Sequence, residues 1–471
     1  MAGSQQLLVI AIDAASPALL RQWAAAGSLP NLARLMADGL VGGTRSVETF
    51  YTGSTWPSFY TASSPAHHGI YWLSQVTPGT YRSERMPAVS FGRRPALWEV
   101  LSDAGKRVLV VDVPLSRLSP GLNGAQVVEW NTHDVLFGFQ TSPPEFAQRI
   151  RRLAGAHPVP PPCDAKHRDA DAYAALADKL VAGAASRGRL TRALLNEEPW
   201  DFAIQVFSEA HCAGHQLWHQ HDPAHPAFDQ HASNGDPVHR VYQAVDAAIG
   251  EALRDIGPTT NVVVMTLHDM SFMTGSSVLL EQVLERLGVT TRPVTTPAPR
   301  SMWHRAVDVL RVLYRIVPKP IRHALFVRRA AARARRSDGA FTLGIDPTRS
   351  QCFAVDMGPL VGGIRLNQRG REAQGVLNAE DRDTFCDTLT GHLLELTHSG
   401  SDLPLVRRVL RTSDLFSGPL SDTLPDLVVE WNLEMPLGSL AVGEGASATL
   451  SAESARIGRV TYVNDYCRTG E

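Results

Sequence analysis

Short, continuously apolar runs recur along the chain, and the first of them, residues 7–12, ends directly in Asp13. Parallel strands buried on both faces have this unbroken, branched apolar character. Similar runs follow at 107–113, 202–207, 261–266 and 427–430. Patterns typical of helices lie between them, for example at 17–39, 96–105 and 241–256. This alternation predicts an α/β fold with a mostly parallel central sheet flanked by helices.

Polar residues follow three of these runs at the point where each predicted strand ends. Asp13 follows the first run, residues 208–215 follow the third, and His268 with Asp269 follows the fourth. In open α/β sheets, ligands bind at the carboxyl ends of the strands. We therefore expect these side chains to meet at one edge of the sheet and to form the functional site.

Composition narrows the class of protein. The 471 residues are 44% hydrophobic and 20% charged, which is typical of a globular protein, and we predict one domain over 1–471. A net charge of -2 gives no general attraction to nucleic acid. Five scattered cysteines without a CxxC pair argue against disulfides and a zinc ribbon, so we expect a cytoplasmic protein. The chain start lacks a basic n-region, and no apolar run is long enough to span a bilayer.

One segment departs from this average. Residues 299–336 are rich in Arg and Lys, with Asp308 as the one acid, and Pro318 and Pro320 divide two amphipathic patterns. We predict a basic helical cap inserted at 296–340. It could be a solvated helix pair, a lid over an anionic substrate, or a surface for weak contact with anionic lipid.

The N-terminal motifs occur in a characteristic order. They are Gly27-Ser28-Leu29-Pro30-Asn31-Leu32, Ala37-Asp38-Gly39, Ser54-Thr55-Trp56-Pro57-Ser58-Phe59, Thr61 and Pro65-Ala66-His67-His68-Gly69-Ile70. The series resembles the type I phosphodiesterase/nucleotide pyrophosphatase family of the alkaline phosphatase superfamily. The resemblance implies an alkaline-phosphatase-like sandwich. It also implies that Asp13 binds a metal and that Thr55 is the nucleophile.

The chemistry of a hydroxyl nucleophile agrees with that role. A hydroxyl is a weak nucleophile at neutral pH, and coordination to a metal lowers its pKa and aligns it for attack. Thr55 can serve as the N-cap of a helix with Pro57 in its first turn, where free N–H groups favour a phosphate. The alternative is that Thr55 only caps the helix, and Ser54 is then the fallback nucleophile.

A second motif lies at 208–218. His215 matches a ligand histidine of the family, and His211 stands where the family has an aspartate. Two histidines at i and i+4 share one helix face, which is a known zinc spacing. His211 therefore either replaces the aspartate as a ligand or forms a hydrogen bond within the core. Asp222 is a candidate outer carboxylate.

The third motif departs further from the family's Ser-Asp-His-Gly-Met. His268 and Met270 match, but Leu267 stands at the position of the ligand aspartate and Asp269 at that of the glycine. Leucine cannot bind a metal. Asp269 is the candidate replacement ligand, and its tolerance of left-handed backbone also fits the glycine position.

The end of the chain resembles the family in two further places. The segment from Leu424 to Trp431 matches "lPDlvv.w", and the chain closes on Cys467-Arg468-Thr469-Gly470-Glu471. Relatives continue this last motif as "R-T-G-D-H-R", in which the histidine is a metal ligand. We therefore expect that the chain stops short of this ligand, either as a truncated product or because the remaining site works without it.

These motifs predict a metal-dependent hydrolase of phosphodiesters or phosphoesters, acting on a small anionic substrate. By the resemblance, Asp13, Thr55 and His268 bind one metal, with Asp269 as a candidate replacement ligand. His215 binds a second metal, with His211 in the place of the family's aspartate. Imidazole ligands favour Zn²⁺. The alternative is a catalytically degenerate member that binds an anionic ligand or a partner without turnover. A third interpretation, a membrane-surface enzyme acting on lipid headgroups, depends on 299–336 alone.

Overall fold

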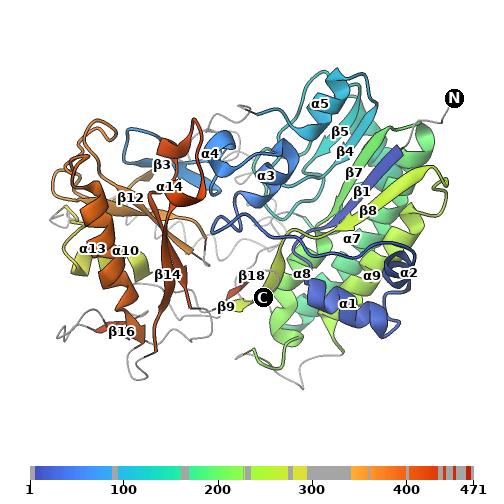
Figure 1. The fold of residues 1–471 in the computed structure, drawn as a ribbon. Coiled ribbons are helices and arrows are strands. Elements are labelled where there is room, and N and C mark those ends of the chain that lie inside the picture. The colour runs from blue at the N-terminus through green and yellow to red at the C-terminus, as the bar shows by residue number, and fades with distance from the viewer. Residues whose placement is uncertain are drawn as a thin grey trace, which may run out of the picture.

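The computed structural model describes residues 6–86, 94–160, 169–225, 228, 235–273, 279–293, 341–358, 361–398, 403–432, 439–441, 449–451 and 463–467. In Figure 1 a helix-flanked sheet lies beside a smaller sheet with its own helices. The predicted cap at 296–340 lies outside the described residues. Among the described helices, none is both long enough and apolar enough to cross a bilayer.

The larger sheet has six strands in the order β6-β5-β4-β7-β1-β8. Its strands are β1 (Gln6–Ile12), β4 (Val108–Val111), β5 (Gly124–Val128), β6 (Gln140–Ser142), β7 (Phe202–Phe207) and β8 (Thr260–Met265). All neighbouring pairs are parallel except β5 and β6. The prediction of a mostly parallel central sheet is confirmed.

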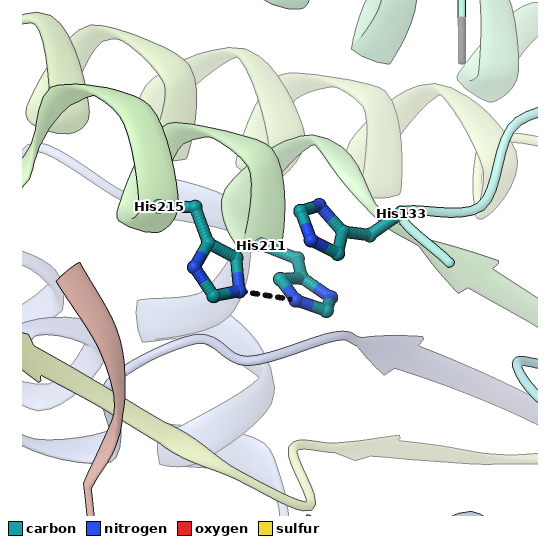
Figure 2. A group of neighbouring side chains, drawn as sticks. All are labelled: His133, His211 and His215. Atoms are coloured by element: carbon teal, nitrogen blue, oxygen red, sulfur yellow. Dashed lines mark hydrogen bonds between the residues drawn. The ribbon is translucent and has the colours of Figure 1, made fainter. Parts of the chain in front are cut away.

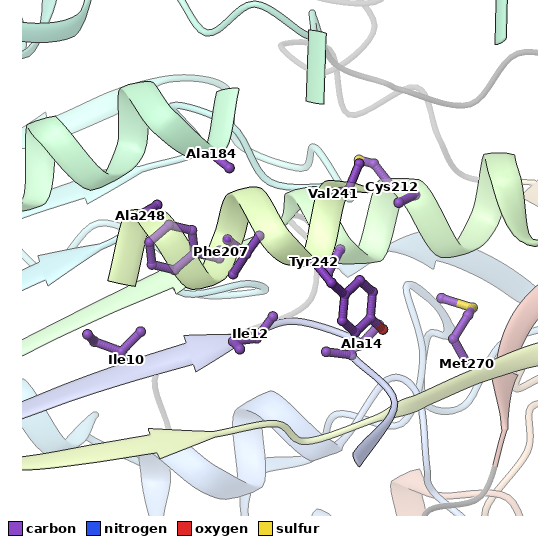
Figure 3. Close-up of a cluster of buried hydrophobic side chains, with 14 of the residues drawn as sticks. Ile10, Ile12, Ala14, Ala184, Phe207, Cys212, Val241, Tyr242, Ala248 and Met270 are labelled. Carbon is purple, nitrogen blue, oxygen red and sulfur yellow. The ribbon is translucent and has the colours of Figure 1, made fainter. Parts of the chain in front are cut away.

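Strand β1 is apolar from Leu8 to Ile12 because these side chains enter two different cores. Leu8, Ile10 and Ile12 belong to the larger core, whereas Val9 and Ala11 belong to a smaller core on the other face. Burial on both faces removes any reason for a polar residue to alternate with apolar ones. Figure 3 shows Ile10 and Ile12 directed toward the helices of the larger core.

Helices cover both faces of this sheet. The larger core includes side chains of α1 (Pro17–Ala25), α2 (Pro30–Asp38), α7 (Ala170–Glu197), α8 (Glu209–Leu217) and α9 (Pro237–Ala252). The opposite face is covered by α3 (Thr55–Thr61) and α5 (Leu97–Asp103), through Trp56, Tyr60 and Trp98. The sheet is therefore the middle layer of three, and its strand ends remain available for a site.

The helical pattern predicted over 17–39 is divided in two in the structure. Gly27 has a φ of +78°, and α2 begins at Pro30. Asn31 donates from its backbone N–H and from its Nδ2 to Asp246 Oδ2 on α9, at 3.2 and 2.9 Å. The Leu-Pro-Asn-Leu motif therefore docks α2 onto α9.

The second sheet is antiparallel, with the order β11-β12-β15-β14. Its strands are β11 (Cys352–Asp356), β12 (Val361–Leu366), β14 (Val406–Arg411) and β15 (Leu427–Trp431). Helices α10 (Leu280–Arg286) and α13 (Arg382–Leu394) share a separate core with it. The placement of the 427–430 run in the parallel sheet is wrong, because burial on both faces makes any central strand apolar, whatever its direction.

Shorter elements complete the described part of the chain. The strands are β2 (Ser74–Val76), β3 (Arg82–Arg85), β9 (Asp269–Met273), β10 (Phe341–Thr342), β13 (Thr397–His398), β16 (Ser439–Ala441), β17 (Thr449–Ser451) and β18 (Val463–Cys467). The helices are α4 (Pro65–His68), α6 (Phe146–Ala154), α14 (Thr412–Leu415), η2 (Trp218–Gln220) and η4 (Ser421–Thr423). Strand β18 pairs with β9, which places Cys467 opposite Asp269.

Candidate metal centre

Asp13 lies where the sequence predicts it, immediately after β1 and buried. Its Oδ2 accepts a hydrogen bond from His211 Nδ1 at 2.6 Å, and its Oδ1 accepts one from Trp56 Nε1 at 3.0 Å. His268 Nδ1 lies 3.9 Å from Oδ1. Burial opposes ionisation of this carboxyl, but His211 and His268 outweigh it and hold the pKa of Asp13 well below its usual range.

His211 and His215 project from the same face of α8, one turn apart, as their spacing predicts. Their Nε2 atoms are 3.0 Å apart, close to the separation of about 3.3 Å expected for two imidazole nitrogens on one tetrahedral Zn²⁺. Burial, and to a lesser extent the adjacent His133, lowers the pKa of His211 well below its usual value. A neutral His211 that donates from Nδ1 to Asp13 has its lone pair on Nε2. In this structure that atom is hydrogen-bonded to His215 Nε2, and a cation held by both rings would replace this bond.

The third member of the cluster, His133, comes from the loop after β5. Its ring stacks on that of His211, with centroids 4.0 Å apart, and on that of His215, at 4.4 Å. One nitrogen from each ring lies within 4.8 Å of the others, and Figure 2 shows the three rings converging. His133 was not predicted from the sequence. The signal that indicated Asp13, a polar residue after an apolar run, is interrupted here by Gln126 within β5.

Of the third sequence motif, residues 267–270, only His268 is shown to lie beside Asp13. His268 is buried beside Asp13. Leu267 packs instead against the apolar core that contains Trp56. Asp269 is the first residue of β9, and its Oδ1 accepts the N–H of Met270 at 2.8 Å. Its role as a ligand stays a prediction.

Thr55 is the first residue of α3, and the N-cap position belongs to Ser54, so the interpretation of Thr55 as the cap is wrong. The Thr55 hydroxyl donates to the carbonyl of Tyr51 and lies 3.2 Å from Ser46 Oγ. Ser54 is completely buried and donates to the carbonyl of Ile70. The bond from Trp56 to Asp13 ties the start of this helix to the carboxylate that also holds His211.

Asp222, the candidate outer carboxylate, is placed elsewhere. It lies just beyond η2, where its Oδ2 accepts from Trp218 Nε1 at 3.3 Å and its Oδ1 from the N–H of Ala224 at 2.9 Å. These bonds fix the turn that ends the α8 segment. Asp13 is therefore the carboxylate that the structure gives to the histidine cluster.

His68, in the Pro-x-x-His-Gly-Ile motif, has a structural environment. Its Nδ1 accepts the N–H of Ile70 at 3.0 Å, and its Nε2 pairs with Ser58 Oγ at 2.9 Å. Burial, together with the neighbouring His67, lowers the pKa of His68 to about 4. Protonation would also remove the acceptor for Ile70, so the folded protein favours the neutral ring.

The fold is expected to lose up to ~3 kcal/mol at His68 as the pH falls from about 6.5 to 4. The reason is that the unfolded chain binds this proton at about 6.5 whereas the folded protein resists it, so the stabilisation is full above pH 6.5 and is lost toward the folded pKa. Denaturant unfolding across this range measures it. His68→Asn, which retains an acceptor for Ile70, should flatten the slope relative to wild type, whereas His67→Asn, which removes only the smaller cause of the shift, should flatten it slightly. Equal slopes in all three proteins would contradict the assignment.

The structure thus defines an α/β protein whose mostly parallel sheet carries a candidate metal centre at the carboxyl ends of its strands. The family model for type I phosphodiesterase / nucleotide pyrophosphatase matches residues 7–432, and the chain belongs to this family. The resemblance found in the motifs is confirmed. Members of the family are hydrolases of phosphoester bonds, so the class of reaction is supported at this level.

Solved structures with a similar fold include two crystal structures of phosphonoacetate hydrolase from Sinorhizobium meliloti 1021. The complex with phosphonoacetate is 16% identical and the complex with phosphonoformate is 17% identical. Each match has a TM-score of 0.49 and covers 91% of this chain and 81% of the other. A search of curated protein sequences found no match.

Proposed function

We propose that this protein is a metal-dependent hydrolase of phosphoester bonds in which His133, His211 and His215 hold one divalent cation. The observation that carries the proposal is the convergence of three imidazoles, one nitrogen from each within 4.8 Å of the others, at the edge of the sheet that also carries Asp13. Membership of the phosphodiesterase family supplies the class of bond.

The donor set fits Zn²⁺ better than Mg²⁺ or Mn²⁺, since neutral imidazole suits zinc and the harder ions prefer carboxylates. Three protein ligands also leave a fourth position for water or substrate, as in catalytic zinc sites. When bound, such a cation polarises a phosphoryl oxygen and stabilises the charge that develops on it. The residues of the chain then have to orient the substrate and the nucleophile beside it.

Asp13 serves both halves of the proposed site. Its Oδ2 fixes the tautomer and orientation of His211, and its Oδ1 lies on the side of His268 and Trp56. Asp13 and His268 are two of the ligands predicted for a second cation, and His268 Nδ1 lies 3.9 Å from Asp13 Oδ1. Thr55 and Asp269 stay predicted members of that set.

Thr55 is the proposed nucleophile. Its Oγ would form a bond to phosphorus as the bond to the leaving oxygen breaks, and the alcohol would leave with the hydroxyl proton. Water would then cleave the bond between Thr55 Oγ and phosphorus and restore the hydroxyl. Support comes from the matching motif and from the bond that ties Trp56, the next residue, to Asp13.

One observation favours a second candidate function, the binding of an anion without turnover. Leu267 stands where the family has a ligand aspartate, and it is packed into an apolar core. A protein with this change could retain the histidine cluster and lose the metal beside the nucleophile.

Metal content and hydrolysis, measured on the same preparation, test the proposal. After reconstitution with Zn²⁺ and removal of excess metal, we expect at least about one equivalent per chain by mass spectrometry. We also expect hydrolysis of bis-p-nitrophenyl phosphate that a chelator abolishes and added Zn²⁺ restores. Bound metal without hydrolysis would favour the anion-binding alternative. Absence of metal after reconstitution would reject the proposed centre.

A further inference from the structure

Arg187, in the middle of α7, is completely buried, and all three of its guanidinium nitrogens donate hydrogen bonds. Nη1 donates to Asp112 Oδ2 at 2.7 Å, and Nε donates to Glu209 Oε1 at 2.9 Å. Nη2 donates to the backbone carbonyl of Asn131 at 2.8 Å. The guanidinium also lies 5.2 Å from the centre of the Trp130 ring. One side chain therefore joins three separate segments of the chain.

Two of these segments are the ones that carry the three histidines. Glu209 begins α8, two residues before His211, and Asn131 lies two residues before His133. Asp112, at the end of β4, strengthens the same connection, because its carboxylate accepts the N–H groups of Trp130 and Asn131 at 2.8 and 2.9 Å. The loop that carries His133 and the helix that carries His211 and His215 are thus both hydrogen-bonded to the guanidinium of Arg187.

Beyond His133, the end of the loop is held by bonds within the loop. The Glu129 carboxylate accepts the N–H groups of Leu136, Phe137 and Gly138, at the far end of the loop. Those bonds set the shape of the loop but fix nothing about its distance from α8. Across the gap, His133 Nδ1 meets Cys212 Sγ at 3.7 Å, which is a weak contact. A second link runs through His157, whose ring nitrogens lie 2.5 and 3.0 Å from Asn131 Nδ2 and whose Nε2 lies 2.9 Å from Glu209 Oε1. Arg187 is the link that carries a fixed positive charge and also reaches Asp112.

A buried ion pair of this kind is a poor way to gain stability. The free-energy cost of desolvating the arginine and its carboxylates offsets most of their electrostatic attraction. Apolar residues of similar volume often stabilise a core more. What the bridge does provide is a fixed geometry, since the planar guanidinium holds its partners at set angles. The geometry that it fixes is the separation between His133 and the two histidines of α8.

We propose that Arg187 is a positioning residue of the metal centre, holding the His133 loop against α8 at the separation at which three imidazoles bind one cation. The inference depends on the proposed function, because it assigns Arg187 to a centre that binds metal. If Arg187 had only a structural role, folded variants would bind metal as wild type does. If it positions the metal centre, a change at Arg187 weakens metal binding in protein that is still folded.

The test uses the full chain in three variants and wild type. Arg187→Lys keeps the charge but cannot bridge three partners, and Arg187→Met removes both charge and bonds. Arg365→Met is the matched control, because Arg365 is also buried and paired with a glutamate, Glu372, but lies in the antiparallel sheet. For each protein, the affinity for Zn²⁺ is measured by chelator competition, the geometry by the visible spectrum of bound Co²⁺, and folding by circular dichroism and thermal unfolding.

We expect Arg187→Lys to bind Zn²⁺ about 10- to 100-fold more weakly than wild type, with a changed Co²⁺ spectrum, and Arg187→Met to lose at least as much. Arg365→Met should unfold at a lower temperature but bind metal as wild type does. If the folded Arg187 variants bind metal normally and give the wild-type spectrum, the positioning role is rejected and the proposed function stands. If neither variant folds while Arg365→Met does, Arg187 is a residue of the fold and the inference also fails. Wild type without bound Co²⁺ would instead reject the centre itself.

Discussion

Thr55→Ala is expected to lower the turnover of bis-p-nitrophenyl phosphate by ~10³-fold or more while leaving in place the cation held by the three histidines. The variant removes the oxygen that attacks phosphorus in the proposed reaction. The fold should survive, because the lost hydroxyl makes a single bond from the first residue of α3 back to the carbonyl of Tyr51, worth about 1 kcal/mol. Steady-state kinetics and thermal unfolding on the same samples measure both quantities.

The same helix offers a matched control. Thr61 lies at the other end of α3 and donates to the carbonyl of Pro57 at 2.6 Å, the same four-residue backward bond that Thr55 makes. Thr61→Ala should therefore have a similar small effect on stability and none on turnover. Activity retained in Thr55→Ala would remove Thr55 from the role of nucleophile. If Ser54→Ala lost activity in that case, the role would pass to Ser54.

The architecture around this helix could be predicted because burial on two faces leaves a plain trace in the sequence. Residues 7–12 and 202–207 are apolar without interruption, and they form neighbouring parallel strands with registered pairing from Leu7 to Ile12. The carboxyl ends of parallel strands meet at one edge of the sheet, so the gathering of Asp13, His211, His215 and His268 there followed from the pattern. The site residues that lie on these strand ends were accessible to sequence reasoning.

His133 was not predicted because β5, the strand that precedes it, is not a continuous apolar run in the sequence. β5 contains Gln126, which is completely buried and still satisfied. Its Oε1 accepts the N–H of Ser119 at 2.7 Å, and its Nε2 donates to the carbonyl of Arg117 at 3.0 Å. A buried glutamine with both ends bonded costs little in the folded protein, but it breaks the apolar run on which the prediction depends. The polar residues after β5 were therefore not counted among the strand ends.

Two other differences have similar causes. An apolar run records burial but not strand direction, so β15 was expected in the parallel sheet and lies in the antiparallel one. A hydroxyl before a helical pattern records the approximate start of a helix but not which residue is the cap, so Thr55 proved to lie one residue inside α3. In both cases the tertiary partners decide, and those partners are far away in the sequence.

His133→Phe is expected to weaken the binding of Zn²⁺ by more than about 100-fold, beyond the usual effect of changing a group outside the ligand set. Phenylalanine keeps an aromatic ring that can stack on His211 and His215, so the loop should keep its place. What it lacks is a nitrogen lone pair, and two imidazoles alone hold a cation poorly. Isothermal titration with Zn²⁺ and the visible spectrum of Co²⁺ measure the loss.

His221 provides the comparison, since its Nδ1 pairs with Asp236 at 2.6 Å, the same distance as His211 with Asp13, but it lies outside the three-histidine cluster. His221→Asn should bind Zn²⁺ as wild type does. If His133→Phe also kept full affinity while His215→Ala lost it, the cation would be held by His211 and His215 without His133, as the family resemblance implies. A loss in both His133→Phe and His215→Ala, but not in His221→Asn, is the result that a centre of three converging imidazoles requires.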